Sequence, residues 1–206
     1  TLSSEDKWNE YYDVILANPP FFSPSGGIQP HKRFGVDSKK AEVLFTSYIL
    51  DHLKPEGRAG IIIPEGIIFQ NGKAYKELRK QIIENALIGV ISLPAGVFQP
   101  YSGVKTSILI LDKKLSKERD SIFFADIQND GFSLGSQRGK IDGSQLPSVI
   151  ENIRNVCRGD QHNLEVISKS KILEDIDLSL SFKKYEERKT IATDFPLSTV
   201  GEICQI

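Results

Sequence analysis

An asparagine followed by two prolines and an aromatic ring stands near the start of the chain, as Asn18-Pro19-Pro20-Phe21. The proline rings fix φ and remove two N–H donors, so the motif combines a side-chain amide, a stiff backbone with unused carbonyls, and a flat apolar face. These groups suit methylation of an exocyclic amino group. Such a nitrogen is a poor nucleophile because its lone pair is delocalised into its ring, and it needs positioning more than a strong base.

In this interpretation, the two N–H groups of the amine donate hydrogen bonds, one to the Asn18 side-chain oxygen and one to the Pro19 carbonyl. The nitrogen is then pushed toward tetrahedral geometry, and its lone pair becomes available to an activated methyl group. The ring of Phe21 stacks on a base that has been taken out of its helix. The alternative is that the motif only ends a strand in a turn, as most Asn-Pro pairs do.

The elements around the motif follow the order of half a doubly wound α/β sheet. Apolar periodicity predicts strands at 14–17, 59–63, 87–93, 105–111 and 121–127, and helices at 41–53, 73–85, 146–156 and, as one interpretation, 167–173. The run at 14–17 indicates a buried strand that ends at the edge where parallel sheets place ligands. Pro55 to Gly57 is expected to break the first helix. The turn at 99–103 predicts a late antiparallel return strand.

Composition narrows the classes of function. The net charge of −1 over 206 residues gives no global basic field, so any nucleic-acid contact must come from local patches. Cys157 and Cys204 have no metal-ligand or CxxC spacing, which indicates reduced thiols in a cytoplasmic protein and no metal site. The apolar runs are too short to span a membrane, and no signal peptide is evident.

Further motifs follow the Asn-Pro-Pro-Phe tetrapeptide in order. They are Leu53–Ala59 (LKPEGRA), Ile63–Gly66 (IPEG), Ile91–Phe98 (ISLPAGVF), Gly103–Ile108 (GVKTSI), Phe124–Phe132 (FADIQNDGF) and Asp177–Leu180 (DLSL). With them the chain resembles the N6-adenine DNA methylases of restriction–modification systems. The resemblance is strongest to the modification subunits of type I systems and to the fused single-chain enzymes related to them, and it covers residues 10–135 well.

The resemblance implies a Rossmann-like, class I S-adenosylmethionine-dependent methyltransferase fold and transfer of a methyl group from that cofactor to adenine N6 in DNA. It implies that Asn18 and Pro19 bind the amino group, that Pro20 shapes the turn, and that Phe21 stacks on the flipped adenine. Phe98 falls where related enzymes place a second aromatic ring. Tyr101 is the alternate candidate, and a loop-anchoring core role is an equal alternative for Phe98.

Basic residues in the loop after the motif are candidates for contacts with DNA phosphates. They are Lys32, Arg33, Lys39 and Lys40, next to His31. For any one of them, a solvated loop position is the simpler interpretation.

The cofactor-binding features of such enzymes are missing from this sequence. No G-x-G-x-x-G is present, Gly26-Gly27 lies after the catalytic motif, and nothing before Tyr11 could form a glycine-rich turn. The chain also contains no methionine, hence no start residue. We therefore expect an internal piece of a longer protein. In it, residues 1–135 are the second half of a catalytic core, most cofactor-binding residues lie upstream of Thr1, and the piece alone is inactive.

The remaining residues predict an extension and a set of partners. Residues 136–193 are expected to form a helical extension or linker, and 194–206 resembles the start of a target-recognition domain. The expected partners are DNA, a specificity subunit or fused target-recognition domain, and a restriction subunit. The strand at 14–17 should be central in a complete sheet, so its free edge predicts self-association or a poorly ordered N-terminus.

Two other functions remain open on the sequence. Enzymes that methylate a protein glutamine or an RNA base amine also use Asn-Pro-Pro followed by an aromatic residue. They usually carry Tyr there and lack the return hairpin and the C-terminal extension. A non-catalytic fragment that serves DNA binding or assembly is the other alternative.

Overall fold

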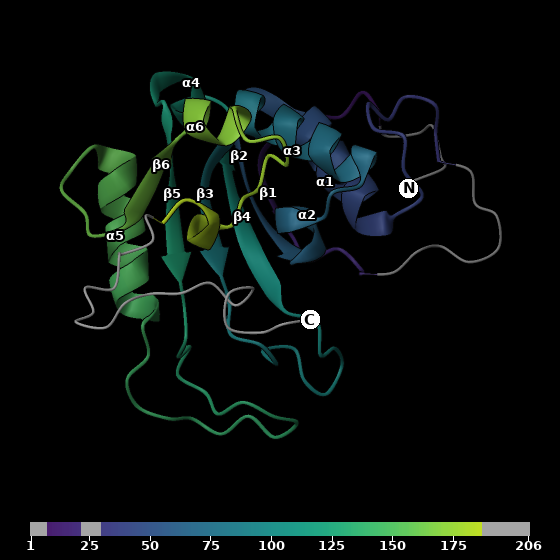
Figure 1. Cartoon of the computed structure of the whole chain (residues 1–206). Helices are drawn as coiled ribbons and strands as arrows, with labels where there is room; N and C mark the ends of the chain where they lie inside the picture. The colour runs from purple at the N-terminus through teal and green to yellow at the C-terminus, as the bar shows by residue number, and fades with distance from the viewer. Residues whose placement is uncertain (1–7, 22–29, 187–206) are drawn as a thin grey trace, which may run out of the picture.

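The computed structural model describes residues 8–21 and 30–186, which form a sheet with helices packed against it (Figure 1). The strands are β1 (Tyr12–Ala17), β2 (Leu53–Pro64), β3 (Leu87–Ser92), β4 (Thr106–Asp112), β5 (Ser121–Asp126) and β6 (Glu165–Ser168). The helices are α1 (Ala41–His52), α2 (Gly66–Phe69), α3 (Lys73–Asn85), α4 (Leu115–Glu118), α5 (Leu146–Arg158), α6 (Lys169–Leu173) and the 3₁₀ helix η1 (Phe182–Lys184).

Three expectations from the sequence fall outside the described residues. Thr1, upstream of which most cofactor-binding residues are expected, precedes the first described residue, Trp8. Gly26-Gly27 and residues 194–206 also lie outside this part. The expected cofactor contacts upstream of Thr1 and the expected start of a recognition domain therefore stay predictions.

A single mixed sheet contains the six strands in the order β1-β2-β4-β3-β5-β6. β1 runs parallel to β2 and β3 runs parallel to β5, whereas β4 is antiparallel to both of its neighbours. The predicted late antiparallel strand is therefore confirmed. It inserts between β2 and β3, so the carboxyl ends of β1, β2, β3 and β5 share one edge of the sheet with the beginning of β4.

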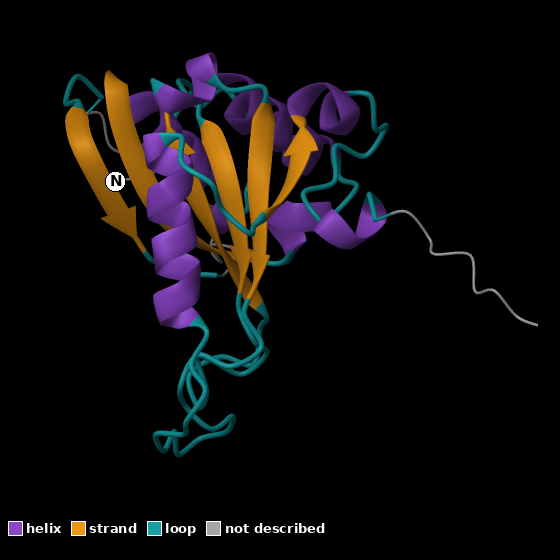
Figure 2. Cartoon of the chain, turned by 90° about the vertical axis from the view of Figure 1, so that its left-hand side faces the viewer, coloured by secondary structure: helices purple, strands orange, loops and turns teal. Residues whose placement is uncertain are grey.

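Helices cover both faces of the sheet, with α5 on one face and α1 and α3 on the other (Figure 2). On the α3 side, Leu78 packs in one apolar cluster with Leu109 of β4. On the other side, Val156 of α5 packs with Ile88 and Phe123. Among the helices that the structure describes, none has the length and apolar character needed to cross a membrane.

β1 forms an outer edge of the sheet, so the prediction of a buried strand there is wrong for this chain. Val14 is 54% exposed and Leu16 is 83% exposed. The strand has β2 on one side and no second neighbour among the described residues, so side chains that a further layer would bury face solvent. Within the part of the chain that the structure describes, this edge of β1 is free.

The start of β2 also differs from the prediction. α1 ends at His52, before Pro55, as predicted, but the strand begins directly afterwards at Leu53, so Pro55 to Gly57 lie inside β2 and not before it. The pairing with β1 shifts in register between Tyr12 and Val14. This irregularity accommodates the proline and glycine in a strand that would otherwise exclude them.

The predicted helix at 167–173 is wrong at its start. Residues 165–168 form β6, which pairs antiparallel with β5, and α6 begins only at Lys169. Ser168 ends the strand and caps the helix, because its side chain accepts a hydrogen bond from the Lys171 backbone N–H. Val166 and Ile167 favour a strand once β5 offers them a partner.

A buried arginine of α3 forms hydrogen bonds to the segment after α6. Arg79 donates to the carbonyl oxygens of Ile67 at 2.9 Å, of Gln70 at 2.7 Å and of Asp177 at 2.7 Å. Its side chain is fully buried, and burial lowers its pKa. The guanidinium group thus replaces hydrogen bonds that water would otherwise give to three chain segments.

Candidate active site

Asn18 lies at the carboxyl end of β1, on the edge of the sheet where parallel strands place ligands. Ala17 pairs with Ile61, so Asn18 comes level with the next residue of β2, which continues to Pro64. The Asn18 side chain is exposed, and within the described part of the chain it has no hydrogen-bond partner. Its amide is therefore available to a ligand.

The residues after Asn18 hold it on a stiff support. Pro19 is buried, Pro20 is exposed and Phe21 is half-buried. Both prolines have fixed φ, and Pro19 restricts the backbone of the preceding residue, so the backbone from which the Asn18 side chain extends is held in place. The half-buried Phe21 leaves part of its ring free, which is the exposure that stacking on a base requires.

The neighbouring strand ends are tied together at this edge. The Glu65 N–H donates to the Lys105 carbonyl at 3.0 Å, and Lys105 Nζ pairs with Glu65 Oε1 at 2.9 Å. Both side chains are partly exposed, so the ion pair contributes at most about 1 kcal/mol. Glu65, for which the sequence predicted no role, joins the end of β2 to the start of β4.

The two aromatic candidates lie in the turn that follows β3. Phe98 is half-buried, whereas Tyr101 is 95% exposed. Two strands, β2 and β4, separate β3 from β1, so at the level of the strands the two sides are about 14 Å apart. The structure thus brings these rings to the same edge as Asn18, across the ends of two strands, and does not place them in contact with it.

The basic candidates divide into two pairs. Lys32 and Arg33 stand next to His31, whose ring lies 5.2 Å from that of Trp8, which in turn contacts His52 at the end of α1. This places the first pair near the start of β1, away from Asn18. Lys39 and Lys40 directly precede α1, and both are exposed. A helix that connects two parallel strands begins near their carboxyl ends, so the second pair lies on the side of Asn18.

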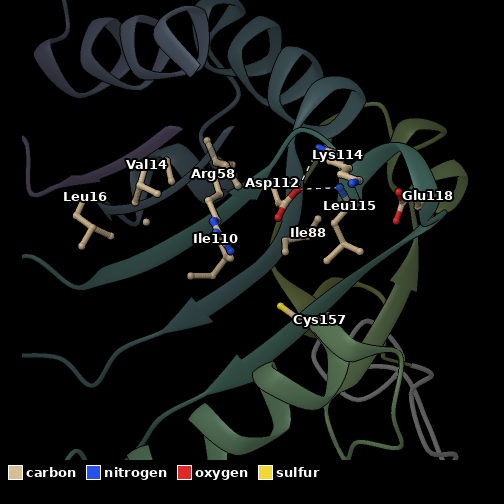
Figure 3. Close-up of a pocket in the computed structure, with 13 residues that line it drawn as sticks. Val14, Leu16, Arg58, Ile88, Ile110, Asp112, Lys114, Leu115, Glu118 and Cys157 are labelled. Atoms are coloured by element: carbon tan, nitrogen blue, oxygen red, sulfur yellow. Dashed lines mark hydrogen bonds between the residues drawn. The ribbon is translucent and has the colours of Figure 1, made fainter. Parts of the chain in front are cut away.

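A hollow of about 460 Å³ lies elsewhere, on the face of the sheet that α5 partly covers (Figure 3). Val14 and Leu16 of β1 form one end of it, Glu118 of α4 lies at the other, and Cys157 of α5 lines it between these ends. Burial raises the pKa of the Cys157 thiol, which makes it a poor nucleophile. The Asp112 carboxylate accepts hydrogen bonds from the backbone N–H groups of Lys114 at 3.0 Å and Leu115 at 2.7 Å, and so stabilises the start of α4. The hollow is an apolar surface next to the free edge.

Arg138 lies at the carboxyl edge of the sheet, the edge that carries Asn18, and no sequence motif indicated it. Its guanidinium reaches back to the turn that carries Phe98 and donates to the Val97 carbonyl at 2.7 Å. Arg138 is 41 residues away from Val97 in a polar loop, and such a position normally indicates a solvated side chain. In the described residues, no group of three or more His, Cys, Asp or Glu side chains could hold a metal ion.

The chain is similar in sequence to proteins of a known family. The family model described as N-6 DNA Methylase matches residues 1–194. The methylase subunit of the type I restriction enzyme EcoEI from Escherichia coli is 36% identical over 108 residues, which make up 52% of this chain. The same match covers 22% of that subunit, so the aligned part spans about a fifth of the length of this curated relative.

Solved structures show the same fold. A chain from a structure of a type I restriction–modification system superposes with a TM-score of 0.64 at 22% identity, over 95% of this chain and 41% of that one. The methyltransferase subunit of a type I system from Streptococcus thermophilus superposes with a TM-score of 0.59 at 28% identity, over 85% of this chain and 40% of that one. The fold is therefore shared with longer chains of type I systems, one of them a methyltransferase subunit.

Proposed function

The chain belongs to the N-6 DNA Methylase family, and we propose that it forms the part of a DNA methyltransferase that holds the target adenine while N6 is methylated. The observation that supports this most directly is the exposed Asn18 amide, set on the buried Pro19 at the carboxyl end of β1. The relatives are subunits of type I restriction enzymes, so we place the whole protein in a restriction–modification system in the cytoplasm.

We propose that this site acts by orienting the N6 amino group of the target adenine. The Asn18 side-chain oxygen and the Pro19 carbonyl accept the two N–H bonds of adenine N6, and the nitrogen lone pair then points away from the base plane. Phe21 stacks on one face of the extruded base. Phe98 is the proposed second ring, because it is held by its surroundings, whereas the side chain of Tyr101 is almost entirely in solvent.

The proposed methyl donor is S-adenosylmethionine, but the residues described here do not form a site for it. β1 is the first strand of the described sheet, and it ends in the Asn-Pro-Pro motif in place of a glycine-rich turn. We therefore propose that residues upstream of Thr1, in a longer protein, bind the cofactor and pair along the free edge of β1. The greater length of the relatives supports this proposal.

The proposed partners follow from the same relatives. DNA would meet Lys39 and Lys40 beside the site, since both are exposed on the side of Asn18. A specificity subunit or a fused target-recognition domain would read the DNA sequence, and a restriction subunit would complete the system. In this proposal, residues 136–193 extend the catalytic core and 194–206 lead toward the recognition domain.

The experiment that tests this function uses the longer protein that contains these 206 residues. It is incubated with DNA, RNA or cell protein and with radiolabelled S-adenosylmethionine, and the products are digested and separated. The proposal predicts N6-methyladenine in DNA, and tighter binding of DNA in which the target adenine is mispaired, because extrusion then costs less. Label in RNA or in protein glutamine, without label in DNA, would instead establish one of the alternative methyltransferases.

A further inference from the structure

The loop between β5 and α5, residues 127–145, projects from the carboxyl edge of the sheet beside the turn after β3 (Figures 1 and 2). Arg138 of this loop crosses to that turn. One nitrogen of its guanidinium donates to the Val97 carbonyl at 2.7 Å, and another donates to the carboxylate of Asp130. The side chains of Arg138 and Asp130 are only 19% and 12% exposed. This ion pair is therefore largely desolvated at the surface of the protein.

The surroundings of the guanidinium fix its plane. Its central carbon lies 5.3 Å from the centroid of the Phe132 ring. Its Nε is buried and has no hydrogen-bond partner among the described residues. A planar group held by a carbonyl, a carboxylate and an aromatic face has one orientation that satisfies all three, which is a use suited to arginine and not to lysine.

The loop that carries Arg138 is itself braced. Gln145 accepts the backbone N–H groups of Gln128 at 2.7 Å and Asn129 at 2.9 Å. The Asn129 side chain donates to the Asp142 carbonyl at 2.8 Å and accepts the Gly131 N–H at 2.8 Å. These hydrogen bonds connect the two ends of the loop, so the backbone that carries Arg138 is held in one position.

The turn that receives Arg138 is otherwise held by local hydrogen bonds and by the Val97 side chain, which packs against the apolar cluster under α5. Gly96 has a φ of +86°, and the Phe98 carbonyl accepts the Ser102 N–H at 2.9 Å, both local features of the turn. The bond from Arg138 to Val97 is a long-range side-chain contact that connects the turn to the loop after β5. It acts on the residue next to Phe98, so it restricts where the Phe98 ring can lie.

We propose that Arg138 is a positioning residue, which fixes the Val97 carbonyl and so holds the Phe98 ring against the extruded base. This inference rests on the proposed adenine methyltransferase function. It adds a residue of the loop after β5 to a site otherwise made by the ends of β1 and β3. Since β3 and β4 are already joined by the Leu93 N–H to the Thr106 carbonyl at 3.0 Å, the core does not depend on Arg138.

The test is a double-mutant cycle in the longer protein, with Arg138→Ala, Phe98→Ala and the double variant. Rates are measured on DNA with adenine at the target position. In a separate binding experiment, 2-aminopurine replaces that adenine, because its fluorescence reports how the extruded base is stacked. A lost charge-assisted hydrogen bond predicts that Arg138→Ala lowers kcat/KM for DNA about tenfold and changes the 2-aminopurine signal. The KM for S-adenosylmethionine is expected to stay unchanged. The double variant should be no worse than Phe98→Ala, because both changes remove the same contact.

Two further variants keep this test decisive. Arg154→Ala, a change in an exposed i,i+3 ion pair on α5, is the matched control and should retain full activity. Arg138→Lys keeps a donor for Val97 and the charge near Asp130, so it should recover part of the activity and of the fluorescence signal. If Arg138→Ala does not fold, Arg138→Lys combined with Phe98→Ala repeats the cycle.

The outcomes separate this inference from the function on which it rests. Independent, additive effects of the Arg138 and Phe98 changes, or an Arg138→Ala enzyme with normal kcat/KM and fluorescence, would overturn the positioning role alone. If the wild-type longer protein forms no N6-methyladenine, the proposed function fails, and the inference fails with it.

Discussion

At the scale of single residues, the groups proposed to touch the base differ in how firmly the fold holds them. Phe21 is half-buried and follows the buried Pro19, so the Phe21 ring is held by residues of its own segment. Phe98 is half-buried in a turn that Arg138 braces from another loop. The base would therefore be bound between a ring held by local backbone stiffness and a ring held by a long-range contact.

Phe21 gives the first prediction at this scale. In the longer protein, Phe21→Ala should weaken capture of the extruded base by about 1–3 kcal/mol, the usual value for a stacked aromatic ring. Binding to DNA that contains 2-aminopurine at the target position measures this. Phe69→Ala, in an exposed phenylalanine of α2, is the control, and equal binding by both variants would exclude Phe21 from the site.

The motif itself was evident from the sequence because four adjacent residues carry it. The contact of Arg138 with Val97 was not, since it joins residues 41 positions apart in two irregular segments. Hydrophobic periodicity does not describe such segments. The separation of Lys32 and Arg33 from Asn18 had the same cause, because it depends on how the loop packs against Trp8.

At the scale of elements, periodicity was sufficient where each helix or strand buries its own apolar face. The helix at 73–85 was predicted at its observed bounds, and its apolar residues Leu78, Ile82 and Ile83 are fully buried. Arg79 stands beside Leu78 and looks like a surface residue in the sequence. It is buried because residues near Asp177, about a hundred positions later, pack over it, and no local pattern contains that information.

The segment that covers Arg79 makes its own charged cluster, which predicts a dependence of stability on pH. Burial alone would raise the pKa of Asp175, but hydrogen bonds from Lys184, from the Ser179 and Asp177 N–H groups and from Tyr185 lower it to about 2. Because the unfolded value is 3.8, this stabilisation is complete above about pH 4 and is lost as the pH falls toward 2.

The corresponding variant is Asp175→Asn. A pKa difference of this size predicts that it lowers the free energy of unfolding by about 2 kcal/mol at pH 7 and by much less at pH 2. Urea unfolding at the two pH values measures both. An equal loss at pH 7 and pH 2 would mean that Asp175 stabilises the segment without its charge.

At the scale of the whole molecule, the free edge of β1 and the apolar hollow beside it form one continuous unpartnered surface of the described chain. Val14 and Leu16 belong to both features. In the proposed longer protein, the cofactor-binding part covers this surface. In the isolated chain, the same surface should instead pair with another copy, as open apolar strands do.

We therefore predict that the isolated 206-residue chain self-associates and that Leu16→Lys reduces the association, because a charge on an edge strand opposes pairing. Light scattering after size-exclusion chromatography gives the mass of each species. Val166→Lys, on the exposed face of the opposite edge strand β6, is the matched control. A chain that stays monomeric at all concentrations would remove the argument for a missing neighbour of β1.

The most direct measurement of the central claim is the rate of adenine methylation by the longer protein with Asn18→Ala. The loss of an oriented acceptor for the amino group predicts a fall in kcat of about a hundredfold or more, with the Kd for DNA changed by no more than about threefold. Asn163→Ala, in an exposed asparagine far along the chain, should leave both values unchanged. An Asn18→Ala enzyme that methylates adenine N6 at the wild-type rate would contradict the account.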